Sequence, residues 1–436
     1  MKTRIQICSN IAVLLVLLVA PTGVSADVVT DWNAIAVQAT VTAARPGQTG
    51  MLDVAMVQVA VYDAIQAIER RYEPYYVEIP NASGSPIAAA AKAAHDVLVS
   101  RFSSQSSSID SLYQQYLLDH GLSENDPGVA IGARAAAAII AIRACDGSFP
   151  NPAPPPFTGG TGIGVWRPTP PGNLAMLAPW LGNVTPFGLT RPSQFRAGPP
   201  PVVTSAEYAL DYNEVKVMGV GGNNSHRTPA QTDLAHFWNA NYGVLWHTVL
   251  RNIASAHIDN IADSSRLFAL ADISIADVLI TSWNTKNYYV FWRPITAIQE
   301  GDNDGNPLTQ GEPRWQPLIT TPNYPDYSSG ANCFTGAVTR VLALFFKTDQ
   351  MDFSITTTNP GPTIQDTRTY NSFSEVAQEV VDARIYEGIH FRFADEAART
   401  QGRQVADWAF NNYLRPIEGP EGGGREGKDS IGGRGF

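Results

Sequence analysis

Three separated segments carry side chains that could together hold a tetrahedral oxyanion. KNYYVFWRP begins at Lys286 and contains Arg293, YSSGAN begins at Tyr327, and RIYEGIH runs from Arg384 to His390. Two arginines, a lysine, a glycine-flanked serine and a histidine supply what is needed to hold phosphate or vanadate and to attack or ligate its central atom. The three segments therefore predict one local cationic pocket.

The first segment predicts two cations on one side of a helix. Lys286 and Arg293 are seven residues apart, close to two helical turns, and share a face if the helix expected from Ile261 continues through them. Pro294 then disturbs that helix. Such a pair is usually solvated when read alone, but the aromatic residues between positions 288 and 292 indicate a helix that is buried on most sides.

The second segment places small residues at the start of a helix. Ser329, Gly330 and Ala331 precede a strongly apolar helical pattern, and free backbone amides at a helix N-terminus attract anions. Ordinary capping by Ser328 or Ser329 explains this segment equally well when it is read alone.

The third segment brings an arginine and a histidine together across a glycine. Gly388 would let the chain bend closely around a ligand between Arg384 and His390, just before another expected helix. A lone histidine is more often a structural residue. Arg384 and the two earlier segments favour a ligand-binding role for His390.

In order and spacing, the three segments resemble the signature of the superfamily of type 2 phosphatidic acid phosphatases and vanadium-dependent haloperoxidases. The mature chain as a whole is similar to exported bacterial haloperoxidase-related members. The resemblance implies an all-α helical bundle and a vanadate cofactor, with phosphate able to occupy the same site. It also implies roles for individual residues: His390 is catalytic and contacts vanadium or phosphorus, and the oxyanion oxygens are bound by Lys286, Arg293, Ser329, Gly330 and Arg384.

Two positions depart from that signature. Ala331 stands where a histidine is usual, and Ala383 stands where a serine is common. The missing imidazole removes a general acid–base, whose loss costs about two to four orders of magnitude in rate. The loss should hurt alkyl phosphate cleavage most, because an alkoxide leaves poorly without a proton. His236, His247 and His257 could approach the pocket and transfer protons, but packed, hydrogen-bonded roles are favoured for them.

The resemblance therefore favours a haloperoxidase-like enzyme that uses bound vanadate and peroxide to oxidise halide or another small nucleophile. Two alternatives stay open: a phosphomonoester hydrolase with His390 as its nucleophile, and a non-catalytic oxyanion-binding protein. The expected partners are small molecules, namely peroxide, halide and an organic acceptor or a phosphoester. Neither the halide nor the oligomeric state follows from the sequence.

Helical periodicity dominates the mature chain. Apolar residues recur at three- and four-residue intervals over 50–72, 87–102, 127–143, 228–240, 245–256, 261–284, 336–346, 374–383 and 390–413. From 149 to 201, repeated prolines block helix and central strand, so this segment is expected to be irregular and to wrap the surface. These patterns predict one all-α domain over 27–414, and the resemblance implies that it is haloperoxidase/phosphatase-like, with its core motifs in 284–414.

The composition and the two ends of the chain indicate what kind of protein this is and where it is expected to be located. With 44% hydrophobic residues in 436 there is ample material for a core, and the net charge of −10 disfavours nucleic-acid binding. The apolar run from Ile11 to Ala20 predicts a secretory signal over 1–26 and a periplasmic or extracellular protein, since a membrane anchor needs roughly 20 apolar residues. No later segment is expected to span a membrane. The bonding state of Cys145 and Cys333 stays open, and the glycine-rich 415–436 is expected to be a flexible tail.

Overall fold

The structure, a computed structural model, describes residues 27–417 except 223–224, 360, 362 and 365. The predicted signal peptide and nearly all of the predicted tail lie outside these residues. The described part of the chain is predominantly helical, which confirms the all-α prediction. Cys145 is exposed, Cys333 is buried, and the two thiols are not bonded to each other.

Thirteen α-helices and one hairpin make up the regular structure of the described residues. The helices are α1 (Val28–Thr42), α2 (Gly47–Glu69), α3 (Pro86–Arg101), α4 (Ser106–Asp119), α5 (Pro127–Arg143), α6 (Ala206–Met218), α7 (Pro229–Trp238), α8 (Tyr242–His257), α9 (Ile261–Tyr289), α10 (Pro294–Gln299), α11 (Gly330–Phe346), α12 (Phe373–Tyr386) and α13 (Arg392–Asn412). Strands β1 (Gln350–Thr356) and β2 (Thr367–Ser372) pair antiparallel. Helices α1, α4, α6 and α10 and the hairpin are not among the ranges predicted from the sequence.

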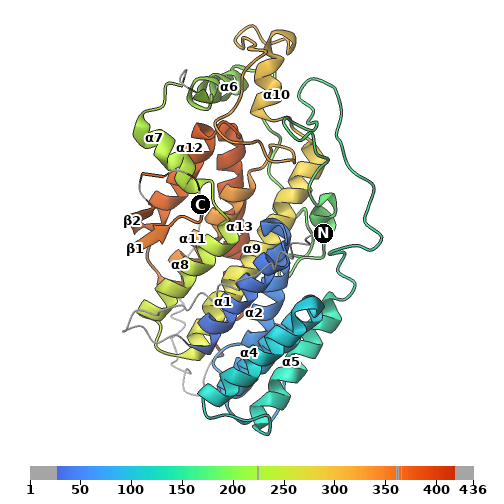
Figure 1. Cartoon of the computed structure of the whole chain (residues 1–436), viewed down its shortest axis with the longest axis vertical. Coiled ribbons are helices and arrows are strands. Elements are labelled where there is room, and N and C mark those ends of the chain that lie inside the picture. Colours follow the sequence, from blue (N-terminus) through green and yellow to red (C-terminus); the bar gives the residue numbers. More distant parts are fainter. Residues whose placement is uncertain (1–26, 223–224, 360, 362, 365, 418–436) are drawn as a thin grey trace, which may run out of the picture.

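Helix α9 is the central element of the fold. Figure 1 shows it, in yellow, crossing the middle of the molecule, with α1, α2, α4 and α5 towards one end and α6 and α10 at the other. It packs against α2, α11 and α13. Both α2 and α9 are long and apolar enough to span a membrane, but 89% and 94% of their most apolar windows are buried inside the fold. The two helices therefore form the core of the bundle.

Small residues let neighbouring helices approach closely. A Cβ on Gly132 would lie 2.2 Å from the carbonyl oxygen of Ala89, where α5 crosses α3. Likewise, a Cβ on Gly402 would lie 2.4 Å from the carbonyl oxygen of Cys333, where α13 crosses α11. The second contact matters for function, because α11 and α13 begin beside the predicted pocket.

The proline-rich segment 149–201 contains no α-helix, as predicted, and only one short 3-10 turn at Pro179–Asn183. Its Trp166 side chain is fully buried, and the Trp166 amide donates to the carbonyl of Val290 just after α9, at 2.7 Å. The segment is therefore tied to the end of α9 that carries Lys286. Figure 1 shows it in green along one edge of the molecule.

Candidate oxyanion site

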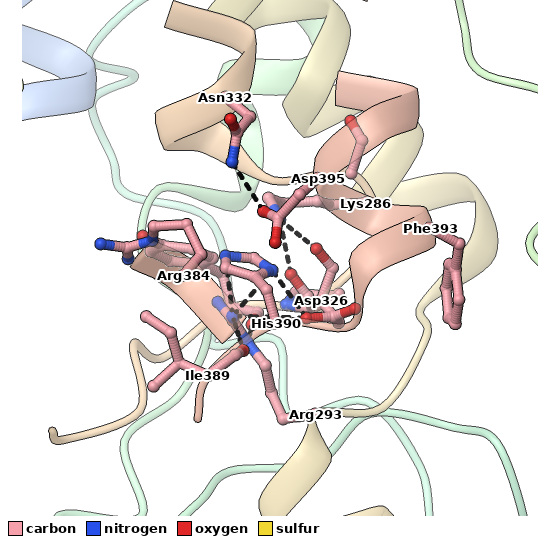
Figure 2. A network of polar contacts seen from close by, with 12 residues as sticks. Lys286, Arg293, Asp326, Asn332, Arg384, Ile389, His390, Phe393 and Asp395 are labelled. Carbon is pink, nitrogen blue, oxygen red and sulfur yellow. Dashed lines mark hydrogen bonds and ion pairs between the residues drawn. The ribbon is translucent and has the colours of Figure 1, made fainter. Parts of the chain in front are cut away.

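The three predicted segments meet in one buried network, which Figure 2 shows. They arrive from different elements: the end of α9, the N-cap of α10, the start of α11, the last turn of α12, and the loop before α13. The six predicted residues are all buried, and all lie on the elements that meet there: Lys286, Arg293, Ser329, Gly330, Arg384 and His390.

Lys286 and Arg293 do not share a helix face, so that prediction is wrong. Helix α9 ends at Tyr289, and Val290 adopts a left-handed conformation with φ 47°. Arg293 is the N-cap of the separate helix α10, with extended backbone angles of φ −88° and ψ 155°. Pro294 is the physical reason, because the residue before a proline is disfavoured in helical conformation. The two cations instead reach the same site from two helices, because the chain leaves α9 at Val290 and begins α10 at Arg293.

Lys286 holds the loop that leads to Ser329. Its Nζ donates to the carbonyl oxygens of Pro325 and Asp326, at 2.6 and 3.0 Å. Complete burial, reinforced by the nearby Arg293 charge, holds the pKa of Lys286 well below its usual range. Lys286 therefore fixes the loop before Ser329 in place, in addition to contributing positive charge to the site.

Arg293 ties the second and third segments together. Its Nε donates to the carbonyl of Tyr324 at 2.8 Å, and its Nη1 donates to the carbonyl of Ile389 at 2.7 Å. Its Nη2 is buried and has no hydrogen-bond partner among the described residues. One edge of the guanidinium is therefore structural, and one donor remains for a ligand.

Neither serine at the start of α11 caps the helix with its side chain. Ser328 Oγ donates to Gln401 Oε1. Ser329 is the N-cap residue, but its Oγ makes no capping hydrogen bond and is buried without a partner in the described part of the chain. Gly330 is the first helical residue, so its amide has no intrahelical acceptor. The anion-binding reading of this segment is therefore favoured over the capping one.

The bend at Gly388 is present as predicted. Its φ is +81°, and a Cβ there would lie 2.3 Å from the carbonyl oxygen of Gly219. Just before it, Arg384 Nη1 pairs with Glu387 Oε2 at 2.6 Å, whereas Arg384 Nε has no partner within the described residues. Burial opposes the charge of Arg384, but the Glu387 carboxylate raises its pKa overall. Burial in turn raises the pKa of Glu387 to about 7, against the effect of Arg384.

His390 lies between a carboxylate and a cation. Its Nδ1 is 2.7 Å from Asp326 Oδ1, and its Nε2 is 3.1 Å from Arg293 Nη1. Burial, together with the charges of Arg293, Lys286 and Arg384, holds the pKa of His390 well below its usual range. The imidazole is therefore neutral at pH 7, the form that can act as a ligand or nucleophile. Burial also raises the pKa of Asp326 to about 7, against the two nearest cations.

The network opens into a cavity of about 340 Å³. Its floor includes Gly330, Ala331, Arg384 and His390, and its other walls come from the start of α2, residues 239–243 and Tyr324. Three buried donors of the predicted residues lack partners among the residues described: Nε of Arg384, which lines the cavity, and Arg293 Nη2 and Ser329 Oγ, whose residues do not line it. Buried polar groups are normally paired, so this set fits a bound oxyanion.

Sequence reasoning missed three acidic residues of the site. Asp326 touches His390, Glu387 pairs with Arg384, and Asp395 Oδ1 accepts a hydrogen bond from Asn332 Nδ2 at 2.8 Å. Burial raises the pKa of Asp395 well above its usual range. None of these three residues stands out in the sequence, because an isolated Asp or Glu is usually exposed. The carboxyl groups offset part of the cationic charge of the site.

The three other histidines of interest do not line the cavity. His247 is fully buried, with Nε2 2.8 Å from Asp272 Oδ1 and Nδ1 2.7 Å from the carbonyl of Gly243. His236 is half-buried and His257 is exposed. None of them takes the place of the imidazole that Ala331 lacks.

Comparison with known proteins agrees with this geometry. Residues 266–419 match the family model of the second helical-bundle domain of vanadium chloroperoxidase. The vanadium chloroperoxidase of Curvularia inaequalis is 28% identical over 288 residues, 51% of this chain and 46% of that protein. The first bacterial vanadium-dependent iodoperoxidase of known structure superposes with a TM-score of 0.76 and 22% identity, over 92% of this chain and 99% of the other. These matches support a relationship to the vanadium haloperoxidases: residues 266–419 fit their second helical-bundle domain, and the whole chain shares their helical fold.

The relationship to vanadium haloperoxidases agrees with the helical fold and with the order of the three segments. A bacterial vanadium-dependent chloroperoxidase, solved in its holo form, also superposes with a TM-score of 0.68 at 18% identity, over 84% of this chain and 91% of the other. The match to the Curvularia protein spans less than half of its length. The division into one domain over 27–414 stays a prediction.

The residues present fit vanadate as an oxyanion. The described residues contain no group of three or more His, Cys, Asp or Glu side chains that could cage a metal ion. A single imidazole, three cations and unpaired N–H and O–H donors suit an anion bound through its oxygens and its central atom. His390 would contact vanadium, and Arg293, Arg384, Ser329 and Gly330 would face the oxygens.

Proposed function

We propose that this protein is a vanadium-dependent haloperoxidase, in which halide, hydrogen peroxide and a proton give hypohalous acid and water. The unpaired buried donors around neutral His390, beside an open cavity, carry the proposal. When bound, vanadate supplies a Lewis-acidic centre that activates peroxide towards a nucleophile. Similarity to proteins described as a vanadium chloroperoxidase and an iodoperoxidase supports the same activity.

The chain's own residues would hold and polarise the oxyanion. Arg293 and Arg384 face it with charged N–H donors, which bind anionic oxygens more strongly than neutral donors do. Their fixed positions in a buried site stabilise negative charge without reorganisation during the reaction. Ser329 Oγ adds a neutral donor, and His390 offers an imidazole nitrogen to the central atom.

The direct test is a paired assay on the purified mature chain. Protein loaded with vanadate is given hydrogen peroxide with iodide, bromide or chloride, and halogenation of an organic acceptor is followed. The same preparation without vanadate is tested for hydrolysis of an aryl phosphate. We expect halide oxidation that depends on vanadate and is lost in His390→Ala. Phosphate ester turnover without any vanadate-dependent halogenation would refute the proposal.

A second candidate, phosphomonoester hydrolysis, is favoured by the contact between Asp326 and His390. A neutral imidazole with a carboxylate oxygen 2.7 Å from its Nδ1 is an arrangement suited to nucleophilic attack on phosphorus. Ala331 argues against an efficient alkyl phosphatase, because it places a methyl group at the cavity where a proton donor would help the leaving group. Aryl esters, whose leaving groups need less protonation, are therefore the fair test of this alternative.

We also propose that the protein acts outside the cytoplasm, on the basis of the signal-like residues 1–26. Expression of the full chain followed by cell fractionation and N-terminal sequencing tests this. A mature N-terminus near Asp27 in the exported fraction is expected. Retention of the intact leader in the cytoplasm would contradict it.

A further inference from the structure

We infer that the hydroxyl of Tyr242 is a further binding group of the site, which donates a hydrogen bond to an oxygen of the bound oxyanion from the cavity side. The inference deepens the proposed function and rests on the same oxyanion site. Tyr242 is the first residue of α8 and lies outside the three segments that predicted the site. It is not among the residues predicted from the sequence to bind the anion.

The Tyr242 hydroxyl stands out among the groups that line the cavity. Within the described part of the chain, just two cavity-lining side chains hold a buried polar atom without a hydrogen-bond partner: Arg384, at Nε, and Tyr242, at its hydroxyl. The residue as a whole is only half-buried, whereas its hydroxyl oxygen is enclosed. A buried tyrosine hydroxyl normally bonds to a partner. We therefore expect its partner to be a molecule that enters the cavity.

The ring of Tyr242 is held from several sides, which fixes the position of the hydroxyl. Its centroid lies 6.0 Å from that of Trp238 and 6.4 Å from that of Phe334, which meets it edge-on. The backbone before it is fixed as well, because the amide of the N-cap residue Asn241 donates to Thr358 Oγ1 at 2.8 Å. A donor held in place loses little conformational freedom when a ligand binds.

The groups beside the hydroxyl favour an anionic oxygen as its partner. The charged side chains nearest to it include Arg384, Glu387 and Asp395. Arg384 pairs with Glu387 through Nη1 at 2.6 Å, and its Nε has no partner among the described residues. Burial raises the pKa of the Tyr242 hydroxyl above its ordinary value, against the effect of Arg384. The hydroxyl therefore keeps its proton at pH 7, and two donors beside one cavity suit an anion.

Tyr242 would supply part of what Ala331 lacks. Ala331 lines the same cavity and has no side-chain donor. A tyrosine hydroxyl can hold an anionic oxygen as a neutral donor, as an imidazole N–H does. It does not exchange its proton readily near neutral pH, because its pKa is raised. The role inferred for Tyr242 is therefore to bind and orient the oxyanion, without acid–base catalysis.

The test compares the wild type with Tyr242→Phe, which removes the hydroxyl and keeps the ring. Calorimetry gives the affinities for inorganic phosphate and for vanadate, and urea denaturation without either anion gives the unfolding free energy. We expect both affinities to fall by about 10- to 100-fold, the usual effect of losing a hydrogen bond to a charged group. The unfolding free energy should stay equal or rise, since the hydroxyl has no partner among the described residues.

The matched control is Tyr208→Phe. The Tyr208 hydroxyl is also buried without a partner among the described residues, but Tyr208 does not line the cavity. Its ring packs against Phe391 and Phe291, with centroids 5.5 and 6.3 Å away, and these contacts remain in the variant. The control should leave both affinities unchanged, while its unfolding free energy also stays equal or rises.

Several outcomes would overturn the inference. Wild-type affinities in Tyr242→Phe would do so, and so would an equal loss of affinity in Tyr208→Phe, because both substitutions would then act through the fold. Should Tyr242→Phe fail to fold, a phosphate-bound structure of the wild type decides: Tyr242 Oη should lie within about 3 Å of a phosphate oxygen, and a separation beyond about 3.5 Å refutes the inference. Failure of the proposed function is separately visible. A wild type that binds both anions through Tyr242 but oxidises no halide would keep the inference and remove the haloperoxidase.

Discussion

At the scale of single residues, the two adjacent serines before α11 have different tasks. Ser328 is bonded inside the protein to Gln401, whereas the Ser329 hydroxyl is buried without an internal partner in the described chain. Both serines look alike in the sequence as caps. Their hydrogen bonds distinguish them: Ser328 stabilises the fold, whereas the Ser329 hydroxyl is available to a ligand.

This difference gives a paired prediction. Ser329→Ala should weaken phosphate or vanadate binding by about 1.5–3 kcal/mol, the usual value of a hydrogen bond to a charged group, with little change in unfolding free energy. Ser328→Ala should do the reverse, because it leaves Gln401 Oε1 buried with one donor fewer. Calorimetric titration and urea denaturation of both variants measure this. Equal effects of the two substitutions on stability would contradict it.

Ala331 supports a prediction of gained activity. The residue lines the cavity and is only partly buried, so a larger side chain can point into open space. Ala331→His would restore a titrating group beside the oxyanion, and general acid–base catalysis typically contributes about 100-fold or more. We expect kcat for halide oxidation to rise by at least about tenfold. A plot of kcat against pH should also show a new titration near neutral pH, from the introduced histidine. An unchanged kcat and pH profile would mean that proton transfer does not limit this enzyme.

At the scale of elements, two close approaches shape the site. The α11–α13 crossing at Gly402 and the left-handed turn at Gly388 bring the starts of α11 and α13 together behind the last turn of α12. In both places a side chain would collide with a backbone atom. The positions of Arg384 and His390 therefore depend on glycine at Gly388 rather than on any contact with a ligand.

Gly388→Ala tests this dependence. A methyl group there would meet both an unfavourable positive φ of +81° and a carbonyl oxygen at 2.3 Å, which together should cost about 2–4 kcal/mol in unfolding free energy. Oxyanion affinity should fall too, since Arg384 and His390 would separate. Gly121→Ala is the matched control, because its φ of +65° is similar but nothing lies within 4 Å. The control should cost about 1 kcal/mol and leave binding intact.

Local sequence signals explain what could be predicted at this scale. Three- and four-residue apolar periodicity located α2, α3, α5 and α7, and prolines located the irregular 149–201. Periodicity could not show that Val290 would break α9 from Arg293, because the break arises from Pro294 and from the packing of two loops. Asp326 and Asp395 were missed for a related reason: their burial comes from residues distant in sequence. The three motifs could be found because the residues within each are close in sequence and their order resembles a known signature.

At the scale of the whole molecule, the protonation of a buried carboxyl group in the site changes the free energy of unfolding. Burial raises the pKa of Glu387 to about 7 from an ordinary value of 4.5. The folded protein therefore binds more protons than the unfolded chain between these two values. The contribution of Glu387 to the unfolding free energy is fully present below about pH 4.5 and is lost as the pH rises through 7.

The substitution Glu387→Gln should remove this dependence of the unfolding free energy on pH. Between pH 5 and pH 7.5 the wild type should lose about 1–3 kcal/mol more unfolding free energy than the variant, because each unit of pKa difference is worth about 1.4 kcal/mol. Denaturant titrations at several pH values measure the difference. Glu396→Gln, at an exposed position, serves as the control and should track the wild type. A variant with the wild-type slope would show that Glu387 does not titrate in this range.

The cavity walls have a consequence for how such a protein can change its substrates. The start of α2 and residues 239–243 line the cavity but contain none of the residues predicted from the sequence to bind the oxyanion, which all lie between 286 and 390. Leu279, Pro322, Tyr324 and Phe334 line the cavity as well. Substitutions confined to the start of α2 and to 239–241 should therefore alter which molecules enter the cavity without replacing any residue expected to bind the oxyanion.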